Sequence, residues 1–220
     1  MLDRPQILLQ ADIEDSHGIP EEISRSISAN AVADIKGSSA LVISDYDRGV
    51  INRDVAESLI NEAKKHKVPI IMDPKLTGLD RCGGSTIVIF ERRGLDLLRR
   101  RMGQETSRDA AMTLVQEYDW GAILVLGGNA GVTLYHSDGR EVFTQTSVTN
   151  PRQQIGLHDA AASAIAFALG CGHDLVESSI LASAACDCIL ASQDGQSILS
   201  REDLTLRIDE ISWQMQISDR

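Results

Sequence analysis

The stretch from Ala40 to Lys75 constrains the fold more than any other part of the chain. Ala40–Ser44 is a short apolar run typical of a buried strand, and Val68–Met72 is a second such run. Between the two, apolar residues recur at helical spacing after Asn52 or Asp54, either of which can cap a helix. A crossover this short makes the two strands parallel. The stretch is therefore predicted to form one strand–helix–strand unit of an α/β domain.

Polar residues follow both predicted strands. Ser44-Asp45-Tyr46 comes after the first strand, and Asp73-Pro74-Lys75 comes after the second. The carboxyl ends of parallel strands meet at one edge of a sheet, and open α/β sheets bind ligands at that edge. The sequence therefore indicates a crevice shared by Asp45, Asp73 and Lys75, although ordinary polar turns explain these residues equally well.

The rest of the chain continues the alternation of strands and helices. Further strands are expected at 6–13, 86–90, 122–126, 132–136 and 141–146, and further helices at 20–34, 95–102, 107–118 (capped by Ser107 or Asp109), 159–169, 175–191 and 203–216. A glycine-rich hairpin turn at Gly127–Gly131 separates the parallel part of the sheet from a small antiparallel stretch. This pattern predicts a single α/β domain over residues 1–220.

Composition excludes several classes of function. The chain has 220 residues, of which 43% are hydrophobic, and its net charge of −11 argues against binding nucleic-acid phosphates or an anionic membrane surface. No apolar run is long enough to span a bilayer, and the N-terminus lacks the basic start of a signal peptide. The four cysteines form no C-x-x-C pair, which favours buried free thiols in a reducing cytoplasm over a metal site.

The segment Gly156–Asp159, which precedes a helix of small residues, is the first candidate for chemistry. A glycine at a helix start leaves N–H groups free to hold an anion, and Asp159 at the same place is able to take a proton from an attacking hydroxyl. Alternatively, Asp159 is only the N-cap of a buried helix. An isolated histidine such as His158 is more often packed or solvated than catalytic.

Two other segments have a functional and a purely structural interpretation. Gly127, Gly128 and Gly131 permit a nucleotide to approach the backbone, but a plain hairpin turn accounts for them as well. The basic run Arg92–Arg101 is most simply the solvated face of a helix.

Several motifs in the chain resemble those of the ribokinase-like (PfkB) sugar kinases, in particular the heptose-7-phosphate kinase domain of bifunctional ADP-heptose synthases. These are Ser44-Asp45-Tyr46-x-Arg48-Gly49, the strand end Asp73-Pro74-Lys75, the segment QILLQADIE at 6–14, Arg81-Cys82-x-Gly84, and Gly156–Asp159 in place of the family's GAGD. The resemblance implies a three-layer α/β sandwich with a mostly parallel central sheet, and it implies ATP and Mg²⁺ as cofactors of an active enzyme.

The resemblance also assigns roles to individual residues. Asp159 corresponds to the catalytic base, and the backbone of Gly156, Leu157 and His158 corresponds to the anion hole. The nucleotide side comprises Gly127, Gly128, Gly131, Lys75 and Asp73, whereas Asp12 and Asp45 lie on the substrate side.

Departures from the family pattern are as informative as the matches. The family's N-terminal third, which carries most of its sugar site, has no counterpart in this sequence. Glu91 and Gly94 replace an asparagine and a glutamate linked to the metal, and Gln153 replaces an aspartate of the family's signature. Leu157 and His158 add bulk where the phosphoryl group passes, and a branched Leu157 is strained if its φ must be positive. Each change is expected to lower phosphoryl transfer by about two powers of ten.

Three interpretations follow. The chain is a degenerate kinase homologue acting through binding or association, an active sugar kinase completed by another chain, or a nucleotide-binding module without chemistry. A second copy or a partner chain is expected to cover the sheet edge that the missing third leaves exposed. A sugar phosphate is the expected small ligand, with no nucleic acid and no membrane.

Overall fold

A computed structural model describes residues 19–148, 151, 154–192 and 199–218. Asp12, the expected strand 6–13 and Gln153 lie outside the described residues. The helices are α1 (Glu21–Ile35), α2 (Arg53–His66), α3 (Arg92–Arg101), α4 (Ser107–Tyr118), α5 (Leu157–Gly170), α6 (Leu175–Ala191) and α7 (Arg201–Ser218), with short 3-10 turns η1 (Leu76–Arg81) and η2 (Gly128–Ala130). The strands are β1 (Leu41–Asp45), β2 (Ile70–Pro74), β3 (Ile87–Glu91), β4 (Ala122–Leu126), β5 (Val132–His136) and β6 (Glu141–Thr144).

The described strands form one six-stranded sheet in chain order, β1-β2-β3-β4-β5-β6. The first four strands are parallel, and β5 and β6 continue antiparallel after the glycine-rich turn. Ser44 pairs with Asp73 and Asp45 with Pro74, so the two polar strand ends lie side by side. The predicted strand–helix–strand unit and the mostly parallel sheet are confirmed.

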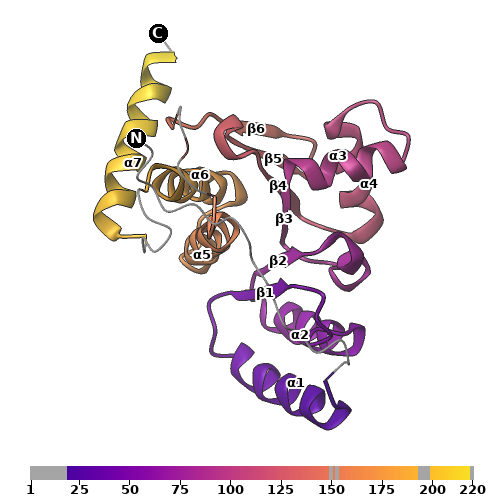
Figure 1. Cartoon of the computed structure of the whole chain (residues 1–220). Helices are drawn as coiled ribbons and strands as arrows, with labels where there is room; N and C mark the ends of the chain where they lie inside the picture. The colour runs from indigo at the N-terminus through magenta and orange to yellow at the C-terminus, as the bar shows by residue number, and fades with distance from the viewer. Residues whose placement is uncertain (1–18, 149–150, 152–153, 193–198, 219–220) are drawn as a thin grey trace, which may run out of the picture.

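Helices cover both faces of the sheet (Figure 1). Successive strand residues point to opposite faces: Val88 and Phe90 pack with α2, α3 and α4, whereas Ile87 and Ile89 pack with α5 and α6. The parallel strands are therefore buried on both sides and read as continuous apolar runs. The arrangement is the expected three-layer sandwich, with α1 packed on α2 and α7 packed on α6 outside the main layers.

Local chemistry explains the bounds of α2. The Asn52 side chain caps the helix by accepting a hydrogen bond of 2.9 Å from the Val55 N–H, which settles the choice between Asn52 and Asp54. The helix ends at Lys67 in a left-handed conformation, with φ of 58°, two residues before Pro69. The chain then turns directly into β2.

Several expected boundaries were wrong; α5, for example, begins at Leu157, two residues before the expected start at Asp159. The helix α4 is capped by Thr106, not by Ser107 or Asp109; Asp109 instead completes a capping box with Thr106. The helix α3 begins at Arg92, three residues before the expected start at Leu95, because β3 ends at Glu91 and the chain bends at once. The strand β2 extends to Pro74, so Asp73 belongs to the strand itself.

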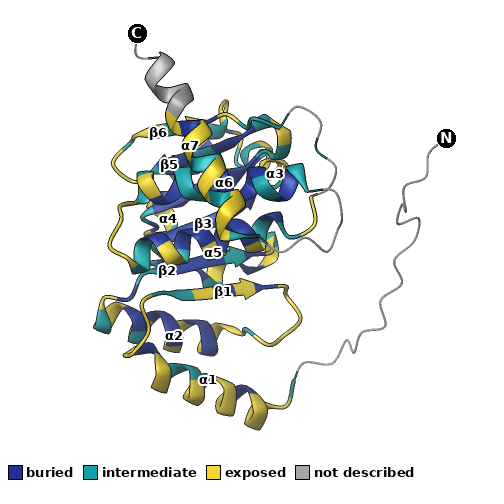
Figure 2. Ribbon diagram, turned by 90° about the vertical axis from the view of Figure 1, so that its left-hand side faces the viewer, coloured by how far each residue is buried: buried dark blue, intermediate teal, exposed yellow. Residues whose placement is uncertain are grey.

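The strand β1 lies at one edge of the described sheet, and β2 is its only partner there. Val42 on β1 is 41% exposed, and most residues of the neighbouring helix α1 are exposed as well (Figure 2). Over the described residues, no helix is long and apolar enough to cross a membrane. Cys82 and Cys186 are buried free thiols as expected, whereas Cys171 is exposed.

Candidate active site

A pocket of about 350 Å³ opens at the carboxyl ends of β1, β2 and β3 and reaches the start of α5. This pocket is called the strand-end pocket below. Its charged lining residues are Asp45, Asp73, Lys75, Glu91, Arg93, His158 and Asp159. The structure thus brings together at one site the strand-end residues and the Gly156–Asp159 segment, which are separated by more than 80 positions in the sequence.

Asp45 is held in a buried ion pair. The residue is 4% exposed, and its carboxylate receives hydrogen bonds from Arg81 Nε at 2.9 Å and from the Asp47 N–H at 2.9 Å. Arg81 also donates to Asp47 at 2.8 Å, and Thr77 donates to the other oxygen of Asp47 at 2.6 Å. The network fixes the turn after β1 to the 3-10 turn after β2, so Asp45 meets the pocket as an already paired carboxylate.

Lys75 lies beside an exposed aromatic ring. Its Nζ is 5.5 Å from the centroid of the Tyr46 ring, within the range of a cation–π contact. Tyr46 is 56% exposed, and both residues line the strand-end pocket. The pair forms one wall of the pocket with a cation and a flat apolar surface next to each other.

His158 is joined to the end of β2. Its Nδ1 is 2.8 Å from Asp73 Oδ1, and its Nε2 is 3.7 Å from Glu91 Oε1. Burial disfavours the charged imidazole, but the hydrogen bond that His158 donates to Asp73 and the charges of Asp73 and Glu91 outweigh burial and raise the pKa of His158. Nε2 is buried and makes no hydrogen bond to another described residue.

The start of α5 is built on a glycine. Gly156, the N-cap, has a φ of 82°, a conformation that residues with a Cβ rarely adopt. Leu157 does not have a positive φ, so the strain considered for it is absent; its side chain is buried against the sheet. Asp159 is exposed and lines the strand-end pocket, while the first N–H groups of α5 lack intrahelical partners.

A second, smaller pocket of about 200 Å³ adjoins the first. It is called the arginine pocket below, and its lining residues are Glu91, Arg92, Arg93, Leu126, Gly127, Gly128, Gln154, Leu157 and His158. Gly131 lies apart from it, in a third pocket with Gly127 on the α3 side. The two pockets meet at the five lining residues that they share, which are Glu91, Arg93, Gln154, Leu157 and His158.

The described residues offer no all-protein cage for a divalent cation, whereas Mg²⁺ at phosphoryl-transfer sites is held by one or two carboxylates together with substrate phosphates. Mg²⁺ requires oxygen ligands in a nearly octahedral arrangement. Asp73 is engaged by His158, and Glu91 is followed directly by two arginines. No group of three His, Cys, Asp or Glu side chains among the described residues is placed to hold a metal ion.

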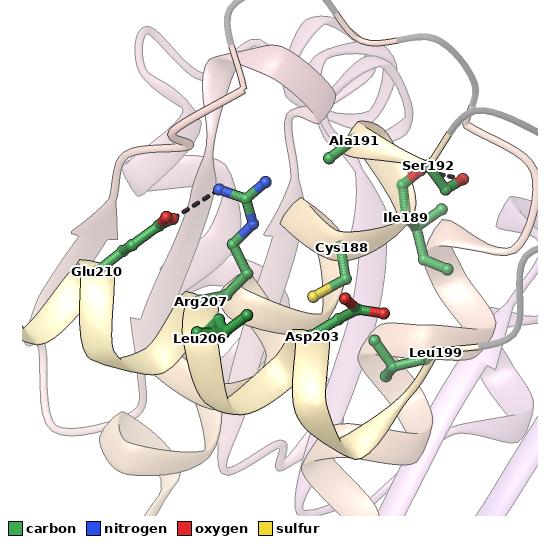
Figure 3. A pocket seen from close by; sticks show the side chains of 9 residues that line it. All are labelled: Cys188, Ile189, Ala191, Ser192, Leu199, Asp203, Leu206, Arg207 and Glu210. Atoms are coloured by element: carbon green, nitrogen blue, oxygen red, sulfur yellow. Dashed lines mark hydrogen bonds and ion pairs between the residues drawn. The ribbon is translucent and has the colours of Figure 1, made fainter.

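A separate pocket of about 320 Å³ lies between α6 and α7 (Figure 3). Arg207, which points into it, is paired with Glu210 at 2.6 Å and donates to Ser147 at 3.1 Å. Asp203 accepts a hydrogen bond from Ser200. Arg207 therefore joins α7 to the segment after β6, whereas Asp203 and Glu210 are engaged within α7 and at its start.

Sequence reasoning missed two features of the site. It noted Arg81 only as part of a family motif and assigned it no contact. It treated Arg92 and Arg93 as part of a solvated helix face, although these two arginines line pockets. The sequence did contain a signal for Arg92 and Arg93, because cations in the first turn of a helix are unfavourable to the helix dipole.

Comparisons with solved structures identify the fold. Phosphofructokinase-2 from Escherichia coli, in complex with substrates and products, matches with a TM-score of 0.74 at 20% identity, covering 89% of this chain and 64% of that one. Ribokinase from Arabidopsis thaliana, complexed with ribose and ATP, matches with a TM-score of 0.67 at 17% identity, covering 81% and 58%. This chain has the ribokinase-like fold. The fold and the resemblance expected from the motifs are both confirmed.

Sequence comparison agrees with this assignment. The bifunctional protein HldE of Shewanella loihica is 29% identical to the ribokinase-like domain over 205 residues, which cover 93% of this chain and 42% of that protein. The chain thus spans less than half the length of this relative. No protein-family model matches the chain. Together the comparisons show a fold shared with phosphofructokinase-2 and a sequence likeness to part of HldE.

Proposed function

We propose that this chain is a cytoplasmic, heptose-kinase-like homologue of the carbohydrate kinases that transfers phosphate weakly or not at all on its own. The observation that carries the proposal is the position of His158. This side chain stands where the strand-end pocket meets the arginine pocket and is fixed there by Asp73 at 2.8 Å. Sugar phosphorylation requires an acceptor hydroxyl and a phosphoryl group to meet in line at such a junction.

The proposal assigns the two pockets to the two substrates. The strand-end pocket, with the exposed Asp159, is the acceptor side, and the arginine pocket is the phosphate side. Asp159 remains exposed and able to accept a proton, which favours the alternative that another chain completes an active kinase. Against that alternative, the bulky side chain of His158 lines both pockets, and the described acids form no all-protein metal site.

A second candidate function is nucleotide binding without chemistry. Gly127 and Gly128 line the arginine pocket together with two arginines, an arrangement suited to an anionic ligand. The two candidates share the fold and the cleft and differ in whether any phosphate is transferred.

A partner is also part of the proposal. The edge of the described sheet at β1 leaves backbone groups free to pair with another chain, and Val42 beside them is 41% exposed. We expect a second copy or another chain to cover this edge. A monodisperse monomer at micromolar concentration in sedimentation velocity would contradict this expectation.

The test of the proposed function is ADP release from Mg·ATP with heptose 7-phosphate and hexose phosphates as acceptors. Kinases typically turn over at about 1–100 s⁻¹, and two defects of about a hundredfold each predict a rate below about 0.01 s⁻¹. His158→Gly, which removes a bulky side chain that lines both pockets, is expected to raise the rate, whereas His158→Gln, which keeps the bulk, is not. A wild-type rate of about 1 s⁻¹ or more that Asp159→Asn abolishes would overturn the proposal.

A further inference from the structure

The two adjoining pockets differ in charge. The strand-end pocket is lined by four carboxylates, Asp45, Asp73, Glu91 and Asp159, and by the cations Lys75, Arg93 and His158. In the arginine pocket, Glu91 is the single carboxylate among the lining residues, beside Arg92, Arg93 and His158. An anionic group is therefore attracted to the arginine pocket, whereas the strand-end pocket suits hydroxyl groups.

Arg92 and Arg93 have no hydrogen bond or ion pair with another described residue. Elsewhere on the same helix, Arg99 and Arg100 both pair with Asp96, at 2.8 and 2.7 Å. The two unpaired arginines stand in the first turn of α3, directly after Glu91, and both are exposed. Their guanidinium groups are thus available to a ligand, and guanidinium groups match phosphate oxygens in geometry.

The position of these arginines is unfavourable for the helix itself. The N-terminus of a helix carries partial positive charge, so acidic residues stabilise the first turn and cations destabilise it. The first turn of α3 contains no acid and two arginines. Two unfavourably placed cations that no contact within the described chain compensates are typical of a functional site.

His158 adds a third donor at the same place. Its Nε2 is buried without a hydrogen bond among the described residues, and the side chain lines the arginine pocket. A raised pKa, due to Asp73 and Glu91 against the opposing effects of burial and Lys75, increases the share of charged imidazole near neutral pH. A ligand oxygen in this pocket would satisfy Nε2.

We propose that the arginine pocket binds the polyphosphate group of a nucleotide without a divalent cation, with Arg92 and Arg93 offsetting the phosphate charge. The proposal deepens the proposed function and rests on its assignment of this pocket to the phosphate side. In this pocket Arg92 and Arg93 place two positive charges beside Glu91, the single carboxylate of its lining.

The test is calorimetric titration of the full chain with inorganic pyrophosphate, in EDTA and in excess Mg²⁺. In EDTA we expect binding that weakens about tenfold or more in Arg92→Gln and in Arg93→Gln, the effect of losing a charge-assisted hydrogen bond. Arg101→Gln is the matched control, because it removes the same charge from the same helix about 13 Å away and Arg101 lines neither pocket.

Thermal unfolding separates this role from a structural one. Arg92→Gln and Arg93→Gln should leave Tm unchanged or raise it, because each removes a cation from the first turn, whereas Arg101→Gln should leave it unchanged or lower it. Binding seen only with Mg²⁺, absence of binding in EDTA, or affinities that Arg92→Gln and Arg93→Gln leave unchanged would each overturn the proposal. None of these measurements depends on turnover, so a failure of this proposal can be told apart from a failure of the proposed function.

Discussion

Removing Arg81 should expose how strongly the turn after β1 depends on one buried ion pair. The side chain of Asp45 is 3% exposed and that of Arg81 is 15% exposed, and their closest atoms are 2.7 Å apart. Replacing Arg81 with methionine keeps an apolar stem of similar length but leaves the Asp45 carboxylate with a single hydrogen bond, from the Asp47 N–H. Breaking a buried pair in this way costs about 3 kcal/mol, and in a chain of this size that lowers Tm by about 6–12 °C.

A double-mutant cycle measured by urea unfolding provides the assay. Arg81→Met combined with Asp45→Asn should cost about 2 kcal/mol less than the sum of the two single changes, because the double variant leaves no buried charge unpaired. Arg53→Met is the control, since its ion pair with Asp80 is exposed and is expected to contribute no more than about 1 kcal/mol. A loss below about 1 kcal/mol for Arg81→Met, or additive single changes, would refute the reasoning and leave Asp45 free for a substrate.

Two further predictions concern His158 and the packing between β3 and β4. Because folding raises the pKa of His158, the pairing with Asp73 stabilises the fold fully below the unfolded value of about 6.5 and loses this contribution as pH rises through the folded value. The stability lost in His158→Gln should therefore be largest in acid and shrink with rising pH in urea unfolding; a pH-independent difference would contradict the assignment. Gly121→Ala should cost about 1–3 kcal/mol because its Cβ would lie 2.5 Å from the Thr86 carbonyl oxygen. Gly37→Ala, which meets only the Asp34 carbonyl oxygen at 3.9 Å, should be nearly neutral by the same thermal or urea unfolding, and an equal loss in both variants would refute the packing argument.

The elements of the fold were largely predictable from the sequence because apolar periodicity reports which face is buried. The bounds of β4 and α6 were predicted correctly, since β4 is an unbroken apolar run and both elements are flanked by turn residues. Capping was less predictable, because Thr106, Ser107 and Asp109 are all good caps and only the direction of the chain after Gly103 decides between them.

The site was predictable in outline and not in detail. Strand order placed Asp45 and Asp73 at one edge, as expected from a parallel crossover. The pairing of His158 with Asp73, 85 positions away, had no signal in the sequence because periodicity assigns faces and not partners. The same limit hid the bond between Arg81 and Asp45, which depends on how the 3-10 turn after β2 folds back.

Calorimetric titration of ATP into the purified chain, first in EDTA and then with excess Mg²⁺, tests the central claim most directly. A kinase-like cleft in which arginines replace the metal should bind ATP in EDTA at least as tightly as with Mg²⁺. Binding that requires Mg²⁺ would show that the phosphate side works as in an active kinase. The absence of binding at millimolar ATP would contradict the nucleotide cleft and leave a kinase-shaped protein that acts through association.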